Sequence, residues 1–290
     1  TTIIDGNDLD RVFDVHDGQV TLKLLHVTGG GNNPGHGGGI QIMNGSLTLE
    51  LVQVTSSQSN GLGGGIRVTG ATTSVAILHS RIIDNTAAEG GGGVYSSRPL
   101  TIVNSTIADN QGSYGGGIAN SFGEAIILNS AITSNKGTTA TSGGGGIYSS
   151  GDTTIVNSTI SGNSTNRASG GGLTQLATGT SGLHNVTITN NTVDLNQENN
   201  YNGGGVYVGG DAEVILANSI IAGNVDNSTN TKHPDCSGAN FESLGHNLIQ
   251  SVTGCTVGGD TTGNLTGVDP KLGALAGNGA LTQTHALLAG

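Results

Sequence analysis

The chain has 290 residues, of which 53 are glycine and none is tryptophan, and its formal net charge is −11. Glycine is far above its usual share of about 7%, so we expect a narrow column of aliphatic side chains in place of a thick globular core. The sparse negative charge argues against nucleic acid and anionic membranes, which bind clustered cations. No apolar run reaches the ~20 residues of a membrane helix.

The chain opens with TTIIDGNDLDRVFDV, a short apolar β-run followed by acidic residues. No capping helix precedes the run, so we expect an exposed strand edge at this end of the fold. The acidic residues either bind a cation or form a solvated acidic surface, and we favour the surface. They are Asp5, Asp8, Asp10, Asp14 and Asp17. A later Gly35-His36-Gly37 echoes a polygalacturonase signature without its companion residues, so we interpret it as a corner.

A Gly-Gly-Gly-aliphatic motif then recurs along most of the chain. Between the copies, short runs alternate apolar and small polar residues, which is typical of strands, and glycine or asparagine separates the runs at corners. A repeat of this kind without helical periodicity indicates a solenoid of stacked coils. The aliphatic positions are Ile40, Ile66, Val94, Ile118, Ile147, Leu173 and Val206.

A second repeat, NSTIxxN, keeps step with the first. We expect its asparagines to lie at bends, where stacked amides form a hydrogen-bonded ladder along the axis. The ladder predicted from the first position consists of Asn104, Asn129, Asn157, Asn185 and Asn218. Each of these five asparagines is followed six residues later by another asparagine. The second set consists of Asn110, Asn135, Asn163, Asn191 and Asn224.

The two repeats together predict an all-β fold, a single-stranded right-handed parallel β-helix of about eight to ten coils. Residues 1–225 carry both repeats, and residues 226–290 are expected to form further coils of the same solenoid. Coil length increases between Asn191 and Gly203. The segment from Thr192 to Asn202, which contains Asp194 and Glu198, should therefore loop out on one side.

Three tyrosines directly follow the aliphatic residue of the glycine motif, at Tyr95, Tyr148 and Tyr207. If the aliphatic residue points inward, these tyrosines line one outer face of the rod. They are either plain surface filling or a lateral contact stripe for another molecule. The equivalent positions in the other coils are Gln41, Arg67, Ala119 and Thr174.

The C-terminal part carries a distinctive series of motifs. They are NSIIAGN, DCSG at 235–238, SLGHNLI at 243–249, TGC at 253–255, VDPKLG at 268–273 and LTQTHALLAG at 281–290. With these motifs the chain resembles bacterial surface and secreted β-helix proteins that have a choice-of-anchor Q domain and repeats like those of polymorphic outer-membrane proteins. The resemblance covers essentially the whole chain. It implies an extracellular bacterial protein, often part of a longer envelope-anchored chain, and it implies no reaction.

The only cysteines, Cys236 and Cys255, both lie in these motifs. In an oxidising extracellular compartment the expected outcome is a disulfide. Two free thiols are the alternative. A zinc site would need more ligands than the nearby His233 and His246 supply.

Catalysis, cofactors and self-association remain to be considered. Cations are scattered and no acid pair recurs one coil apart, as glycoside hydrolysis requires, so we expect no enzyme activity and no cofactor. Unpaired strand edges at both ends predict head-to-tail stacking into a filament. The expected function is an extracellular structural solenoid; an adhesin or surface-polysaccharide binder and a polysaccharide lyase or hydrolase are the alternatives. Predicted end contacts are Thr1, Thr2, Ile3, Ile4, Leu287 and Leu288.

Overall fold

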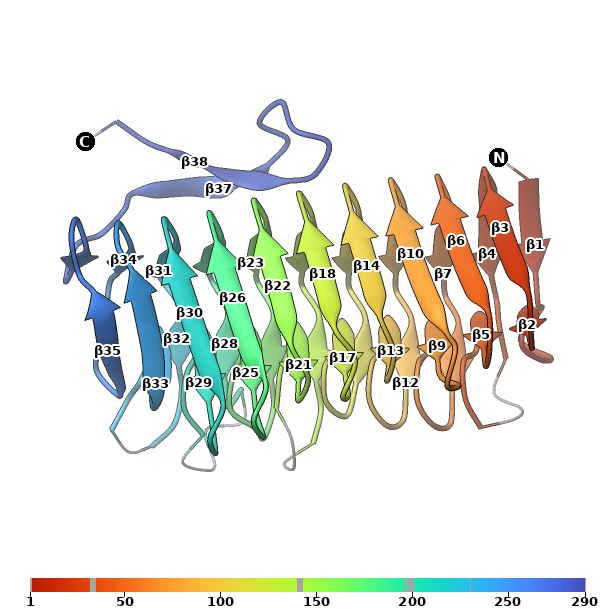
Figure 1. Ribbon diagram of the computed structural model, residues 1–290, viewed down its shortest axis with the longest axis horizontal. Coiled ribbons are helices and arrows are strands. Elements are labelled where there is room, and N and C mark those ends of the chain that lie inside the picture. Colours follow the sequence, from red (N-terminus) through yellow and green to blue (C-terminus); the bar gives the residue numbers. More distant parts are fainter. Residues whose placement is uncertain are drawn as a thin grey trace.

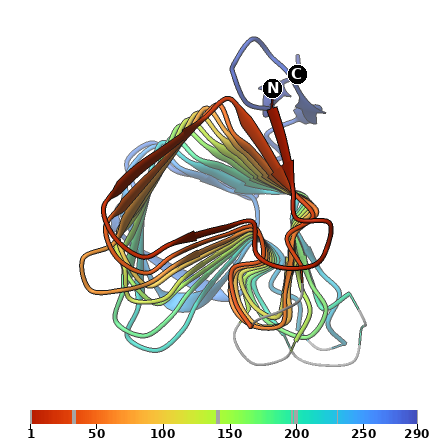
Figure 2. The ribbon, with the colours of Figure 1, turned by 90° about the vertical axis from the view of Figure 1, so that its right-hand side faces the viewer.

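The computed structural model describes residues 2–31, 35–139, 143–195, 197, 201–229 and 231–289. The protein is a parallel β-solenoid of about nine turns (Figure 1). Viewed along its axis, the turns superpose into a tube with flat sides (Figure 2). Within the described ranges every regular element is a strand, so the all-β fold class is confirmed. Those ranges contain no helix that could span a membrane.

The strands form four stacks, which we call sheets A, B, C and D. The first two turns contribute to sheets A, B and C only, and the turns from β7 onward also contribute to sheet D, whose last strand is β32; sheets B and C join through β33. Sheet A contains β1 (Thr2–Asp5), β4 (Leu25–Thr28), β7 (Gln53–Thr55), β11 (Arg81–Ile83), β15 (Thr106–Ala108), β19 (Ala131–Thr133), β23 (Thr159–Ser161), β27 (Thr187–Thr189), β31 (Ile220–Ala222), β34 (Leu248–Ile249) and β36 (Leu265–Thr266). Sheet B contains β2 (Phe13–Val15), β5 (Ile40–Ile42), β9 (Ile66–Val68), β13 (Val94–Ser96), β17 (Ile118–Asn120), β21 (Ile147–Ser149), β25 (Leu173–Gln175), β29 (Val206–Val208) and the start of β33 (Cys236–Leu244).

Sheet C contains β3 (Gln19–Lys23), β6 (Ser46–Glu50), β10 (Ser74–Leu78), β14 (Leu100–Val103), β18 (Ala125–Leu128), β22 (Thr153–Val156), β26 (Thr180–His184), β30 (Glu213–Ala217), the rest of β33 and β35 (Cys255–Asp260). Sheet D contains the short strands β8 (Gln58–Ser59), β12 (Thr86–Ala87), β16 (Gln111–Gly112), β20 (Lys136–Gly137), β24 (Ser164–Thr165), β28 (Thr192–Val193) and β32 (Val225–Asp226).

The core consists of aliphatic ladders in which one side chain stacks on its equivalent in the next coil. The seven aliphatic positions of the glycine motif are successive register partners in sheet B, and each is at most 1% exposed. Burying such a side chain contributes about 1.5–3 kcal/mol. A second ladder runs through the middle of sheet A. It consists of Ile82, Ile107, Ile132, Ile160, Ile188 and Ile221.

The coil around β15 explains the NSTIxxN repeat residue by residue. Asn104 turns the corner with φ of 50°, a left-handed conformation that asparagine tolerates better than most residues. Ser105 and Ile107 then point inward, while Thr106 lies on the outer side of β15. Asp109 makes a second left-handed corner with φ of 55°, and this corner turns Asn110 into the core. Two corners five residues apart therefore define one short strand.

The buried asparagine ladder is formed by the second repeat position. In each coil the Nδ2 group donates to Oδ1 of the asparagine in the following coil, at 2.9–3.0 Å. The same Oδ1 also accepts the backbone N–H of the preceding coil's asparagine. These side chains are buried, and both the Nδ2 and the Oδ1 of each amide have hydrogen-bond partners, as buried polar groups require. The ladder residues are Asn85, Asn110, Asn135, Asn163, Asn191 and Asn224.

The first-position asparagines, from which the sequence predicts a ladder, lie instead on the outer corner between sheets C and A. Asn129, Asn157, Asn185 and Asn218 are exposed and Asn104 is partly exposed, and all have φ of 49–56°. Their side chains bond along the axis twice, from Asn157 to Asn129 at 3.3 Å and from Asn185 to Asn157 at 3.0 Å. Their main contribution is the left-handed backbone. A serine follows each of them except Asn185, which precedes Val186. This serine points inward and accepts the N–H of the preceding coil, as Ser105 does for Ser80.

The glycine triplets are required by the close approach of neighbouring coils. Gly91 opens its triplet with φ of 69°, which favours glycine. A Cβ added to Gly93 would meet Gly117 of the next coil and the amide of Asn110. The triplet therefore lets each coil lie directly against the asparagine ladder.

The C-terminal residues depart from the predicted arrangement. Parallel coils end at β36, whereas the sequence assigns all of 226–290 to coils. The chain then forms an antiparallel hairpin of β37 (Leu272–Ala276) and β38 (Thr284–Leu287), which lies along the outside of sheet A (Figure 1). His285 Nε2 bonds Ser161 Oγ at 2.9 Å, and Thr282 Oγ1 donates to the Asn129 carbonyl at 3.2 Å. Small outer residues of sheet A, such as Thr133 and Ala222, become buried there.

Candidate interaction surfaces

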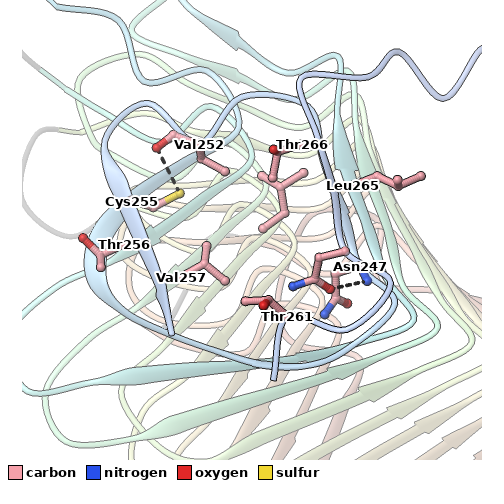
Figure 3. A pocket seen from close by; sticks show the side chains of 10 residues that line it. Asn247, Val252, Cys255, Thr256, Val257, Thr261, Leu265 and Thr266 are labelled. Atoms are coloured by element: carbon pink, nitrogen blue, oxygen red, sulfur yellow. Dashed lines mark hydrogen bonds between the residues drawn. The ribbon is translucent and has the colours of Figure 1, made fainter. Parts of the chain in front are cut away.

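The C-terminal end of the solenoid exposes its core. A pocket of about 560 Å³ opens between β35, β36 and the turns that join them (Figure 3). We call this pocket and the free edges of β35 and β36 the terminal surface. Val252 is 40% exposed and Leu265 is 51% exposed. The pocket is lined by Asn247, Ile249, Val252, Cys255, Thr256, Val257, Thr261, Asn264, Leu265 and Thr266.

The disulfide predicted from the sequence holds this end together. Cys236 in β33 is bonded to Cys255 in β35, with 5.5 Å between their Cα atoms. Cys236 is fully buried as the last member of the sheet B aliphatic ladder, whereas Cys255 lines the pocket. The bond therefore fixes the last coil to the coil before it. In the chain-entropy model, closing a loop of this size contributes about 3 kcal/mol.

The buried asparagine ladder also ends here, on a carboxylate. Asp235 Oδ1 accepts from Asn224 Nδ2 at 2.9 Å, and Oδ2 accepts from the Ser251 N–H at 2.8 Å. The amides of the ladder direct their N–H groups toward this end, so an acceptor without protons completes the series. Burial raises the pKa of Asp235. Burial disfavours the charged carboxylate in the folded state. The protein therefore loses stability as pH rises from about 3.8, the ordinary pKa, through the raised pKa of Asp235 in the folded state.

The N-terminal end of the solenoid also has free strand edges and a partly exposed core. The outer edges of β1, β2 and β3 pair with no strand among the described residues, and we call these edges the first-coil surface. Val20 in β3 and Val257 in β35 belong to one inward column of sheet C that is otherwise buried over most of its length. The side chains between these two valines are buried, whereas Val20 and Val257, at the two ends of the column, are half-buried.

The predicted end contacts are distributed unevenly. Ile4 points inward at the first-coil surface and is half-buried, whereas Thr2 and Ile3 are exposed on β1. Thr1 lies outside the described residues. Leu287 and Leu288 are 69% and 57% exposed, but the hairpin places them on the flank of the rod. The sequence did not single out Val20 and Val257, because an isolated valine in a short strand carries no mark of an end position.

The predicted tyrosine stripe lies on the outer face of sheet B. Register places Gln41, Arg67, Tyr95, Ala119, Tyr148, Thr174 and Tyr207 in one column. The column residues Arg67, Tyr95 and Tyr148 are half-buried. Tyr207 is also half-buried, and its ring lies over Gly209, where an added Cβ would meet it. Of the predicted excursion beside sheet D, Asp194 is buried and Glu198 lies outside the described residues.

Corner residues that the sequence did not reveal complete this face. Tyr114 contacts Tyr148 edge-on, with 4.9 Å between ring centroids, and its ring lies against Gly90. His36, from the predicted corner, accepts the Leu62 N–H through Nδ1 at 2.8 Å. We call His36, Arg67, Glu89, Tyr95, Tyr114 and Tyr148 the lateral cluster. The repeat pattern did not identify Tyr114 and His36, because each lies just before a glycine triplet and outside the repeated positions.

The environment of the lateral cluster shifts the pKa of Tyr114 and of His36. Burial raises the pKa of Tyr114 to about 12, with further contributions from Tyr95, Tyr148 and Glu89. Burial and Arg67 lower the pKa of His36. The neutral ring, whose Nδ1 is an acceptor, carries its proton on Nε2. The Nε2–H group of His36 is therefore a hydrogen-bond donor at neutral pH.

We expect an alkaline titration to show Tyr114 as a separate late step. The chain has five tyrosines and no tryptophan, so tyrosinate absorbance is free of interference. A step near pH 12 should appear and should vanish in Tyr114→Phe. A titration complete near pH 10, the model-peptide value, and unchanged in Tyr114→Phe would contradict the packing of this cluster.

Comparison with known proteins adds no relative. No protein-family model, curated protein or solved structure matches the chain.

Proposed function

We propose that this chain is an extracellular bacterial, non-catalytic structural solenoid that assembles head to tail. The observation that carries the proposal is the inward column of sheet C, whose apolar members are half-exposed at its two ends, at Val20 and Val257. A core column that stops in water at both ends gains burial when the two ends meet.

The geometry of such a junction follows from the coil. The free edge of β35 in one copy would pair with β3 of the next, and β36 with β1, because these are the last and first strands of sheets C and A. The strands of sheets A and C run in parallel, so the direction of both sheets continues across the junction. The contact joins two different surfaces and does not close on itself. It therefore builds a filament.

The hairpin is compatible with this assembly. It leaves the last coil sideways and follows sheet A back toward earlier coils, so the terminal surface stays open although the chain continues past it (Figure 1). The disulfide supports an extracellular location, because such bonds persist in oxidising compartments.

Electron microscopy of the purified protein over a range of concentrations tests the proposal. We expect rods whose lengths are whole multiples of one solenoid, and a longer mean length at higher concentration. Sedimentation velocity should show the same growth. Single rods of uniform length at every concentration would overturn the proposed function.

A further inference from the structure

The lateral cluster contains a cation with unused hydrogen-bonding capacity. Arg67 donates from Nη1 to Gln41 Oε1 at 2.8 Å, while its Nε is buried without a partner among the described residues. A buried donor without an acceptor destabilises the folded state. Because Nε is closed to solvent, a ligand carboxylate would meet the planar guanidinium through Nη2, which has no hydrogen-bond acceptor among the described residues.

Among the described residues, the nearby acids do not bond to the guanidinium of Arg67. Asp14 is engaged by Arg11 at 2.6 Å and by the amide of Gln41 at 3.3 Å. Glu89 is exposed and attracts Arg67 through space, but the two form no ion pair within 4 Å in the described structure. Arg67 is thus half-buried, positively charged and not neutralised by direct contact.

Aromatic rings continue from Arg67 along the rod axis. Tyr95 is its register partner in the next coil, and Tyr148 follows two coils later, with Tyr114 packed against it. Tyrosine rings give saccharides an apolar face and a hydroxyl at once. Coils repeat every ~4.8 Å, which is close to the length of one pyranose unit in an extended chain.

We propose that the lateral cluster binds an extended acidic oligosaccharide, with one uronate carboxylate on Arg67, the next sugar ring on Tyr95 and the third sugar ring along on Tyr148. His36 Nε2–H supplies a further donor near the carboxylate, and Glu89 supplies an acceptor for sugar hydroxyls. This site lies on the flank, so it is independent of the head-to-tail junction and is present in single rods and filaments alike.

Titration calorimetry with two matched probes tests the site. The probes are hexagalacturonate and its fully methyl-esterified form, which has the same backbone without charge. We expect the acid to bind at least tenfold more tightly than the ester. Arg67→Gln should reduce acid binding at least tenfold, to the level of the ester. Arg67→Lys, which keeps the charge but loses the planar guanidinium, should give an intermediate affinity.

Two further variants complete the design. Arg81→Gln removes an exposed cation on the outer side of sheet A and should leave both affinities unchanged. Tyr148→Ala should weaken acid and ester by the same factor. Circular dichroism confirms that each variant is folded. Equal affinity for the two probes, an unaltered Arg67→Gln protein, or no binding of hexagalacturonate at millimolar concentration would each overturn the proposal.

Discussion

Replacing Asn135 with aspartate should lower the free energy of unfolding by about 3 kcal/mol or more at neutral pH. The side chain is 0% exposed, and its Nδ2 donates to Asn163 Oδ1 and to the Ile107 carbonyl, both at 2.9 Å. Aspartate has the same shape but cannot donate. Two acceptors would therefore face a buried carboxylate, and the ladder would be interrupted at its centre.

Asn129→Asp is the matched control, because Asn129 lies one repeat position earlier, is exposed and retains φ of 49°. Its effect should stay within about 0.5 kcal/mol, as is usual for surface substitutions. Guanidinium unfolding measures both variants. Burial disfavours the charged aspartate, so Asn135→Asp should regain stability as pH falls toward 4. Equal stability of the two variants would show that the inner ladder does not support the fold.

The second large effect concerns assembly. Val257→Asp should weaken the head-to-tail junction at least about 100-fold, because burying a valine contributes roughly 1.5–3 kcal/mol and a buried carboxylate adds a desolvation cost. Val257 lines the terminal surface and is half-buried in the single rod, and the disulfide at Cys255 holds its strand in place. Sedimentation velocity should therefore show single folded rods at concentrations where the unmodified protein grows.

Leu281→Asp is the control for this variant. Leu281 is 76% exposed in the turn of the hairpin, away from both end coils. The same change in charge there should leave assembly intact. Loss of assembly in both variants would point to net charge as the cause. Filament formation by the Val257→Asp protein would contradict the proposed junction.

Spacing alone predicted the coils and the aliphatic ladders, because a solenoid repeats its contacts at a fixed sequence interval. The asparagine positions were harder to separate. Asn104 and Asn110 are the same residue type six positions apart, yet one supplies a left-handed corner and the other a buried amide. Only the inward or outward direction of each side chain distinguishes them, and that direction depends on how the two corners divide the strand.

Features outside the repeat could not be placed from the sequence. The hairpin of β37 and β38 has no counterpart in the coils, and its seat depends on small residues such as Thr133 and Ala222 on sheet A. Tyr114 reaches the tyrosine column from a corner, so no periodic pattern marks it. The disulfide was predictable, because Cys236 and Cys255 are the only cysteines of the chain and both lie in motifs that resemble those of extracellular proteins.

Mixing two end variants tests head-to-tail assembly most directly. Val257→Asp blocks the terminal surface and leaves the first-coil surface intact, whereas Val20→Asp does the reverse. Each variant alone should remain a single rod. An equimolar mixture should give rods of exactly two copies, one of each variant, and no longer species. Filaments from either variant alone, or single rods only in the mixture, would contradict a junction between the terminal and first-coil surfaces.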